Sequence, residues 1–349
     1  MTHVGIDLHK MESQICVIDE TGEVLAEQRI ATRRQALEEA LGRWPGSQVL
    51  VEACNESEWV ARHLESRGHT VVVADPNYTP MYGHRHKAYK TDRRDAWALA
   101  SASAQGLFRR AHRTSEARRV VRAELVTREA LVRTRSRYIS VIRARLRGEG
   151  WRLRSGDVTS FVARVNELPL EPELLAQVQP LLRVMELVNR EIARADRSLE
   201  RKAKADPVVR RLESVPQVGP ITALAFVAAL DDVSRFRNAH QVESYLGLVP
   251  REHSSGEHQG RGRITKTGDK RVRWLLIECA WGIVRSRRAS VESLQRWTDK
   301  IRTRRGQMIA AVALARRLAG ILYAMWRDEQ IYDPQKLEHP RHLVEAMTA

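Results

Sequence analysis

Four acidic side chains stand where a structural acid is unusual. Asp7 interrupts the apolar run of residues 4–8, Glu52 follows the apolar run 49–51, and Asp92 and Asp95 open a helical pattern three residues apart. A carboxylate in an apolar strand is costly unless a cation offsets its charge, and residues three apart share a helix face. Carboxylate oxygens suit Mg²⁺ or Mn²⁺, and two such ions stabilise the attacking and leaving oxygens of a phosphodiester. We therefore predict that Asp7, Glu52, Asp92 and Asp95 are metal-binding catalytic residues.

The helical pair of acids also has a structural interpretation. Asp92 is a suitable helix N-cap, and Asp95 is a first-turn acid that the helix dipole favours. The two residues alone therefore leave both interpretations open.

The surrounding pattern predicts a mixed α/β sheet. Three consecutive strands are expected within residues 3–30, followed by a helix at 35–43, a strand at 48–52, a helix at 59–67, a strand at 70–74 and a helix at 92–104. In open α/β sheets, ligands gather beyond the carboxyl ends of the strands. This arrangement would bring the acids of the strands to one end of the sheet.

The middle of the chain is predicted to be helical. One seam repeats every seven residues at Leu125, Val132, Ile139 and Leu146, while its companion positions are Val121, Arg128, Arg135 and Ile142. A cleaner apolar seam runs through residues 178–199, and prolines at 169 and 172 separate the two segments. The pattern predicts either an antiparallel hairpin or a dimerising coiled coil.

A second folded unit is predicted from residue 206. Residues 212–223 have helix, Pro/Gly turn and helix spacing, with Pro220 at the first helical position after Gly219. A helix-hairpin-helix of this kind can bind phosphate through its amides, although an ordinary helical connection has the same spacing. Further helices are expected at 272–287 and 307–327. The predicted domains are an acidic catalytic domain at 1–108, a helical spacer at 109–205, a mainly helical domain at 206–335 and a polar tail at 336–349.

Positive charge dominates the chain and is concentrated in two segments. Lys and Arg number 59 against 43 acidic residues. Residues 109–154 hold 15 arginines and 4 acids, and residues 261–305 hold 14 Lys/Arg and 4 acids. Such one-sided charge favours phosphate contact over a merely solvated face. The predicted nucleic-acid contacts are Arg128, Arg135, Arg143, Arg147, Gly219, Arg261, Arg263, Lys266 and Lys270.

Composition excludes several classes of protein. With 43% hydrophobic and 29% charged residues the chain is globular, and three cysteines without CxxC spacing signal neither a zinc site nor a disulfide framework. The apolar stretch 308–326 is interrupted by Arg316 and Arg317, so we expect a core helix rather than a membrane anchor. A reducing cytoplasm, with association with the nucleoid, is the expected location.

The acidic motifs resemble a known family. The segments Gly5-Ile-Asp-Leu-His-Lys, Val51-Glu-Ala-Cys and Lys90-Thr-Asp-Arg-Arg-Asp-Ala are similar to the three acidic motifs of DEDD-type transposases of the insertion-sequence 110 family, in its 1111-like branch. The resemblance implies a ribonuclease-H-like (RuvC-like) fold, as in Holliday-junction resolvases. It also implies that the four acids bind Mg²⁺.

The second half of the chain resembles the same family. Residues 247–256, 260–270 and 273–276 are similar to its carboxy-terminal transposase motif, which carries a nucleophilic serine. The serine directly before the glycine is Ser255, with Ser254 as the alternative; by itself Ser-Ser-Gly is typical of a flexible turn. The basic segment 260–270 lacks the spacing of a nucleotide-binding P-loop. The resemblance implies a covalent phosphoserine link to DNA, a site shared between protomers and a structured guide RNA encoded by the element.

Three functions therefore remain open. The first is a DNA recombinase acting through Ser255, as a dimer or a higher homo-oligomer. The second is a metal-dependent resolvase or nuclease that uses water as nucleophile. The third is a nucleic-acid-binding protein without catalysis, in which the acids are structural.

Overall fold

The computed structural model describes residues 1–82, 91–255 and 258–337, without the side chains of residues 253–261 and 336–337. The chain divides into two compact units, Met1–Thr114 and Ser115–Ala349.

The first unit is built on a five-stranded mixed sheet with the order β3-β2-β1-β4-β5. Its strands are β1 His3–Leu8, β2 Glu12–Ile18, β3 Val24–Ala31, β4 Gln48–Glu52 and β5 Thr70–Ala74. The first three strands form an antiparallel meander, and β4 and β5 continue the sheet in parallel with β1. The mixed sheet predicted from the sequence is confirmed, with β4 and β5 at their predicted bounds.

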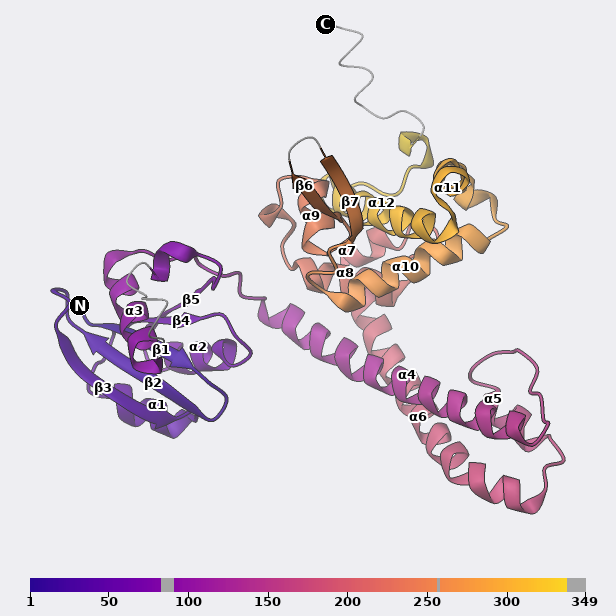
Figure 1. The fold of residues 1–349 in the computed structure, drawn as a ribbon, viewed down its shortest axis with the longest axis horizontal. Coiled ribbons are helices and arrows are strands. Elements are labelled where there is room, and N and C mark those ends of the chain that lie inside the picture. Colours follow the sequence, from indigo (N-terminus) through magenta and orange to yellow (C-terminus); the bar gives the residue numbers. More distant parts are fainter. Residues whose placement is uncertain (83–90, 256–257, 338–349) are drawn as a thin grey trace, which may run out of the picture. The chain divides into compact units, whose positions relative to one another are not determined.

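Helices cover both faces of this sheet (Figure 1). On one face α1 (Arg34–Leu41) and α2 (Ser57–Glu65) enclose an apolar core with alternate residues of β1, including Val4 and Ile6. On the other face α3 (Asp92–Gln105) packs Leu99 against Leu50, beside the short 3-10 turn η1 (Thr79–Tyr82). The period of two in a strand therefore assigns Gly5 and Asp7 to the face that α3 covers.

Gly5 lets α3 approach β1 closely. A Cβ atom at this position would lie 2.0 Å from the carbonyl oxygen of Ala96 and 2.3 Å from the amide nitrogen of Ala100. Only a residue without a side chain fits this contact. Since Asp92 and Asp95 lie on the first turn of the same helix, this contact sets their distance from β1.

In the second unit, α4 (Glu116–Gly148) and α6 (Pro172–Ala205) form an antiparallel hairpin, with α5 (Phe161–Asn166) near its tip (Figure 1). Ion pairs and hydrogen bonds cross the hairpin: Arg118 to Asp206, Lys202 to Glu124, Arg128 to Asp196, Arg135 to Asn189 and Arg145 to Gln177. Of the two arrangements that the heptads predicted, the chain thus adopts the hairpin. Arg128 and Arg135 of the seam thus contact partners on α6, although Nε of Arg135 is buried without a hydrogen bond among the described residues.

Short and medium helices complete the second unit. They are α7 Pro207–Leu212, α8 Pro220–Leu230, α9 Ala239–Tyr245, α10 Lys270–Arg285, α11 Glu292–Arg305 and α12 Gln307–Arg327, with short 3-10 turns at Val233–Arg235, Ala289–Val291 and Pro334–Leu337. Their core also includes Val121 and Leu125 of α4 and Leu199 of α6. The near ends of the hairpin therefore belong to the same core as the carboxy-terminal helices, whereas the sequence predicted a separate spacer.

The basic segment around residue 255 differs from the loop that we predicted. β6 (Pro250–Ser255) and β7 (His258–Ile264) pair as antiparallel strands. These strands were not predicted because charged residues and glycines stand where alternating apolar residues would indicate a strand. The helices α9 and α11 were also missed, since both are mostly polar.

Helix α12 has the length and apolar composition of a membrane span. Its Leu314, Leu318 and Leu322 are nevertheless fully buried in the core, and Arg316 forms an ion pair with Glu243 at 2.5 Å. These contacts agree with the prediction of a core helix.

Candidate active site

The two strand acids meet at the carboxyl ends of neighbouring parallel strands. In the register of β1 and β4, Ile6 is opposite Val51, so the next residues along are Asp7 and Glu52. Leu50 and Gly5 face α3, and the residues two further along face the same way. Asp7 and Glu52 therefore lie side by side at the sheet edge beneath the start of α3.

Asp92 and Asp95, on the first turn of α3, lie close to the carboxyl ends of β1 and β4. Asp95 is buried, whereas the side chain of Asp92 is 49% exposed. The N-cap of α3 is Thr91, whose hydroxyl accepts a hydrogen bond from the amide of Arg94. The interpretation of Asp92 as the cap is therefore wrong. Because Thr91 fills that role, Asp92 at the first helical position is directed to the strand ends instead.

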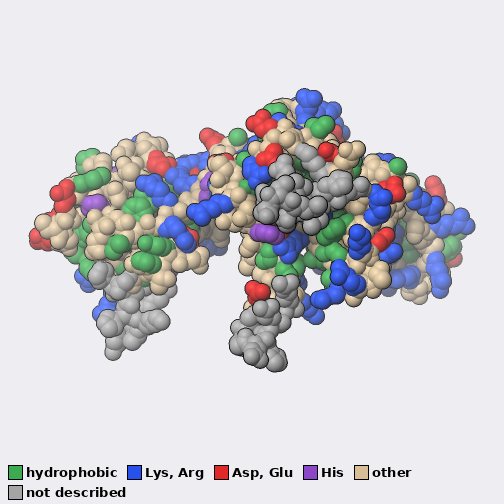
Figure 2. Space-filling model, turned by 90° about the horizontal axis from the view of Figure 1, so that it is seen from above, with side chains coloured by type: hydrophobic (Ala, Val, Ile, Leu, Met, Phe, Trp, Pro, Cys, Tyr) green, Lys and Arg blue, Asp and Glu red, His purple; other side chains and the backbone are tan. Residues whose placement is uncertain are grey.

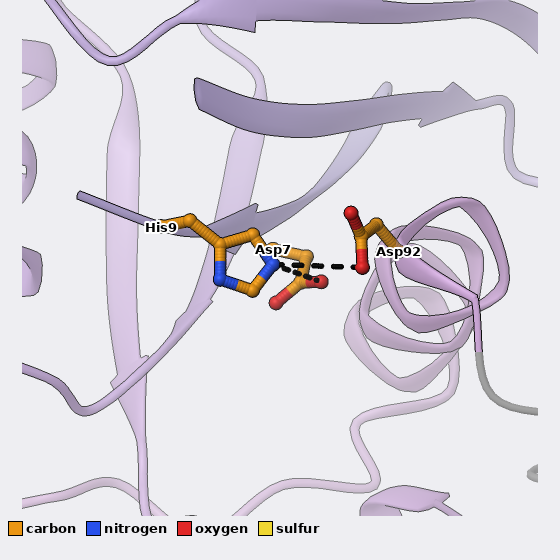
Figure 3. Close-up of side chains that lie close together, drawn as sticks. All are labelled: Asp7, His9 and Asp92. Carbon is orange, nitrogen blue, oxygen red and sulfur yellow. Dashed lines mark ion pairs between the residues drawn. The ribbon is translucent and has the colours of Figure 1, made fainter. Parts of the chain in front are cut away.

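His9 lies between the two groups of acids. Its Nε2 atom is 3.3 Å from Oδ2 of Asp7 and 3.6 Å from Oδ1 of Asp92, and Figure 3 shows the three side chains converging. His9 follows Asp7 by two residues, which places the two side chains on the same side of the extended chain. Its role was missed in the sequence analysis, although this i, i+2 spacing was a usable signal.

The pKa of Asp7 indicates that the other three acids lie close enough to influence it. Burial raises this pKa above the usual aspartate value, His9 partly opposes the shift, and the charges of Asp95, Asp92 and Glu52 raise it further. Like charges held this close repel one another, and a cation between them relieves that repulsion.

These residues fit a divalent cation. Ligand atoms of Asp7, His9 and Asp92 lie within 4.8 Å of one another. The two distances from His9 are shorter than twice a metal–ligand bond of about 2.1 Å, so one ion can contact neighbouring members of the group. Asp7 and Asp92 offer the hard oxygen ligands that Mg²⁺ and Mn²⁺ prefer, and His9 adds a nitrogen ligand.

Glu52 has a partner that the sequence analysis did not identify. The hydroxyl of Tyr82, at the end of η1, donates a hydrogen bond of 2.6 Å to Oε2 of Glu52. This bond holds one oxygen of the Glu52 carboxylate in place. Nothing in the local spacing links residues 30 positions apart, so only the fold could show this contact.

The predicted nucleophile lies in the second unit. Ser254 and Ser255 are at the end of β6, paired through their backbones with Gln259 and His258. The side chains of both serines and of Arg261 lie outside the described residues. The predicted site therefore has its acids in one unit and its serine in the other.

The loop after β7 is held by a buried arginine. Nη1 of Arg273 donates hydrogen bonds of 2.7 Å to the carbonyl oxygens of Leu246 and Thr267. Gly268 has a φ of +70°, and a Cβ there would lie 1.8 Å from the carbonyl oxygen of Tyr245. This packing fixes a loop that presents Lys266 and Lys270, both exposed, while Arg263 is exposed on β7.

The arginines of the helical hairpin fall into two groups. Arg128 and Arg135 are half-buried at the seam, where they contact Asp196 and Asn189. Arg143 and Arg147 are exposed near the tip, with Arg145, Arg152 and Arg154. Figure 2 shows Lys and Arg side chains predominating at the hairpin tip. Gly219, the N-cap of α8, is exposed at the turn before that helix.

Comparison with known proteins identifies the class. The family model described as "Transposase IS116/IS110/IS902 family" matches residues 209–295, and a transposase model of the DEDD type from the IS110 group matches residues 4–149. A probable family 20 transposase of Pseudomonas aeruginosa is 31% identical over 345 residues, covering 96% of this chain and 99% of the relative. The transposase for insertion sequence element IS1111A of Coxiella burnetii is 31% identical over 338 residues, covering 94% of this chain and 90% of the relative.

The fold and the site define an α/β domain with an acidic cluster suited to divalent cations, followed by a basic helical domain. The matches extend along nearly the whole chain and cover both domains. The chain belongs to the IS116/IS110/IS902 family of transposases, the DNA-processing enzymes of insertion sequences.

Proposed function

We propose that this transposase cleaves and exchanges DNA strands with the help of Mg²⁺ or Mn²⁺ held by Asp7, Glu52, Asp92 and Asp95. The observation that carries the proposal is that ligand atoms of Asp7, His9 and Asp92 lie within 4.8 Å of one another at the strand ends, beside Glu52. Carboxylates held close together repel one another, and a bound cation would offset this repulsion. An acid with a purely structural role has no such reason to lie beside other acids. When bound, the metal supplies charge neutralisation for the scissile phosphate.

Within this proposal, the hydroxyl of Ser255 is the nucleophile, with Ser254 as the alternative. Its oxygen forms an ester bond to phosphorus as the bond from phosphorus to a deoxyribose oxygen breaks. The serine loses its proton to a base, and the leaving oxygen gains one. Because the phosphoserine bond conserves the energy of the phosphodiester, a second strand can be joined without ATP.

The basic loop and the hairpin tip support binding of nucleic acid. Exposed Arg263, Lys266 and Lys270, together with Arg261, would neutralise phosphate near the serine. Arg143 and Arg147 at the tip would contact the backbone of DNA or of a guide RNA encoded by the element. Arg128 and Arg135 contribute less to this contact, because their guanidinium groups are engaged within the hairpin. A homo-oligomer would allow the acids of one protomer to serve the serine of another.

The test is a search for the covalent adduct. The protein is expressed together with its native flanking DNA, so that any guide RNA is present, and is incubated with labelled DNA and Mg²⁺. We expect an adduct that resists denaturant, with the nucleotide mapped by peptide mass to Ser255. Ser255→Ala and Asp7→Asn should abolish it, and Ser254→Ala should retain it.

The outcomes separate the three functions. An adduct that persists in Asp7→Asn contradicts the role of the acids. Cutting that needs metal but survives Ser255→Ala and Ser254→Ala identifies a hydrolytic nuclease that uses water. Binding with neither cutting nor adduct, in a preparation that contains the guide RNA, favours a nucleic-acid-binding protein without catalysis.

A further inference from the structure

A hollow of about 310 Å³ opens in the second unit between α4, the first turn of α8 and the first turns of α10. Its apolar lining comes from Leu125 and Val132 of α4, Ile221 of α8 and Leu275 of α10. An adjoining hollow of about 420 Å³ shares the residues Glu129, Arg133, Lys270 and Arg271. The two hollows together form a groove beside α4, which we name the α4/α10 groove.

An exposed tryptophan forms part of the wall of the first hollow. Trp274 is 50% exposed, although its neighbours Val272, Arg273 and Leu276 are buried in or against the core. The helix α10 therefore holds the indole ring at the side of the groove, where half of the Trp274 surface stays exposed. Within the described part of the chain, no hydrogen bond of the indole Nε1 is formed. Such a ring offers a flat apolar face and a free donor to a ligand.

The rim of the groove is cationic. Glu129 accepts from Nε of Arg271 at 2.6 Å and also pairs with Arg133, so one carboxylate holds two guanidinium groups in place. Arg128 lies on the same rim, paired with Asp196. Lys270 is exposed and has no ion pair among the described residues. The rim thus has four cationic side chains, whose paired carboxylates are only those of Glu129 and Asp196.

The other acid near the groove does not reverse this charge. Asp269 lines the second hollow, but its Oδ1 accepts hydrogen bonds from the amides of Arg271 and Val272 and so caps α10. The groove as a whole therefore combines an aromatic wall and an apolar floor with a rim that attracts phosphate. This combination is the one by which proteins bind single-stranded nucleic acids.

We propose that the α4/α10 groove binds an unpaired DNA nucleotide, with its base against the indole of Trp274 and its phosphate at Lys270. The proposal rests on the DNA-processing function. An unpaired base is required because the bases of a duplex are stacked on one another and cannot lay a face on the indole ring. The volume of the first hollow suits one base rather than a helix or a folded domain.

The binding test uses the full-length protein, without divalent cations, and a 15-residue oligo(dT) with a single 2-aminopurine, whose emission falls when it stacks on an aromatic ring. We expect Trp274→Ala to weaken binding on the order of tenfold and to remove the quenching. Trp274→Phe should keep most of both. Lys270→Gln should lower the slope of log affinity against log salt by about 0.7, whereas Trp274→Ala should leave the slope unchanged.

Matched controls separate this contact from a general loss of structure. Met308→Ala removes a side chain of α12 that is 69% exposed, and it should leave binding unchanged. A duplex of the same length should bind wild type and Trp274→Ala equally. Equal binding of oligo(dT) by wild type and Trp274→Ala would overturn the proposal, as would equal weakening for single strand and duplex. Loss confined to oligo(rU) would identify an RNA site and overturn it too.

The result does not depend on catalysis. The binding assay contains no divalent cation and reads the emission of the base and the salt dependence, so it does not require the acids of the first unit. Failure of the adduct experiment would thus leave the binding result intact. Normal binding by Trp274→Ala together with a normal adduct would refute only the groove.

Discussion

At the residue scale, Asp7 connects stability with pH. Its pKa in the folded protein is raised by burial and by the neighbouring carboxylates. The folded state then binds more protons than the unfolded state, so the metal-free protein loses stability as pH rises from the ordinary aspartate value through the raised one. We expect Asp7→Asn to remove this loss and to increase the melting temperature at neutral pH. Melting curves between pH 4 and pH 8, recorded with chelator, measure the difference.

The matched control for this prediction is Glu39→Gln. Glu39 is an exposed acid of α1, on the opposite face of the sheet, and its carboxylate accepts from Gln35. The stability profile of Glu39→Gln should follow that of wild type. A profile of Asp7→Asn that also follows wild type would contradict the raised pKa.

A second prediction concerns His9. As an imidazole among carboxylates, it would add a nitrogen ligand to a site of oxygen ligands. We expect bound Mn²⁺ to show a nitrogen hyperfine coupling by pulsed electron paramagnetic resonance. His9→Asn should remove the coupling and weaken Mn²⁺ binding roughly tenfold. His63→Asn, which alters a histidine paired with Glu38, should change neither. A coupling that survives in His9→Asn would show that His9 is not a ligand.

At the scale of elements, the contact between β1 and α3 sets the geometry of the site. Gly5→Ala would place a Cβ atom within 2.3 Å of two backbone atoms of α3. We expect the helix to move away from the sheet, at a cost of about 1–3 kcal/mol, and DNA cutting to fall sharply because Asp92 and Asp95 move with it. Denaturant unfolding and a cleavage assay measure the two effects.

Gly148→Ala is the control for this change. It ends α4, and nothing lies within 4 Å of the position of its Cβ atom. Stability should be unchanged or slightly greater. Wild-type stability and activity in Gly5→Ala would show that α3 is not held by this contact.

The elements also show where sequence reasoning succeeds. The strands β4 and β5 and the helix α12 are continuous apolar or periodic segments, and the sequence predicts them almost to the residue. Asp7 and Glu52 were predicted as site residues because a carboxylate within or at the end of an apolar strand is conspicuous, whereas the spacing of Asp92 and Asp95 also allowed a structural role. Neither Tyr82, 30 residues from Glu52, nor the pair of strands β6 and β7 carries a local signal of this kind. Both depend on contacts that only the folded chain makes.

Tertiary contacts also changed the interpretation of particular charges. From the sequence, Arg128 and Arg135 were predicted to contact phosphate because many arginines lie around them. In the fold they cross the seam between α4 and α6 and contact Asp196 and Asn189. Those partners lie 68 and 54 residues away. A local count of charge does not include them.

At the scale of the whole molecule, the division into two units has a testable consequence. Asp7, His9, Glu52, Asp92 and Asp95 all belong to Met1–Thr114, which has apolar cores of its own on both faces of its sheet. We expect residues 1–114 to fold alone and to be stabilised by Mn²⁺, by about 2.7 kcal/mol at a hundred times the dissociation constant. Circular dichroism melting with and without Mn²⁺ checks this. A fragment that melts without cooperativity, or that ignores Mn²⁺, would show that the site needs the second unit.

In the intact transposase, we propose that the four acids form one metal site. The most direct measurement is Mn²⁺ binding by the full chain, followed by electron paramagnetic resonance, for wild type and for Asp7→Asn, Glu52→Gln, Asp92→Asn and Asp95→Asn. We predict that each of the four substitutions weakens binding at least tenfold, since each removes one charged oxygen ligand, and that Glu39→Gln does not. Unchanged binding in Asp7→Asn and Asp92→Asn, with wild-type folding, would show that these acids do not hold the ion.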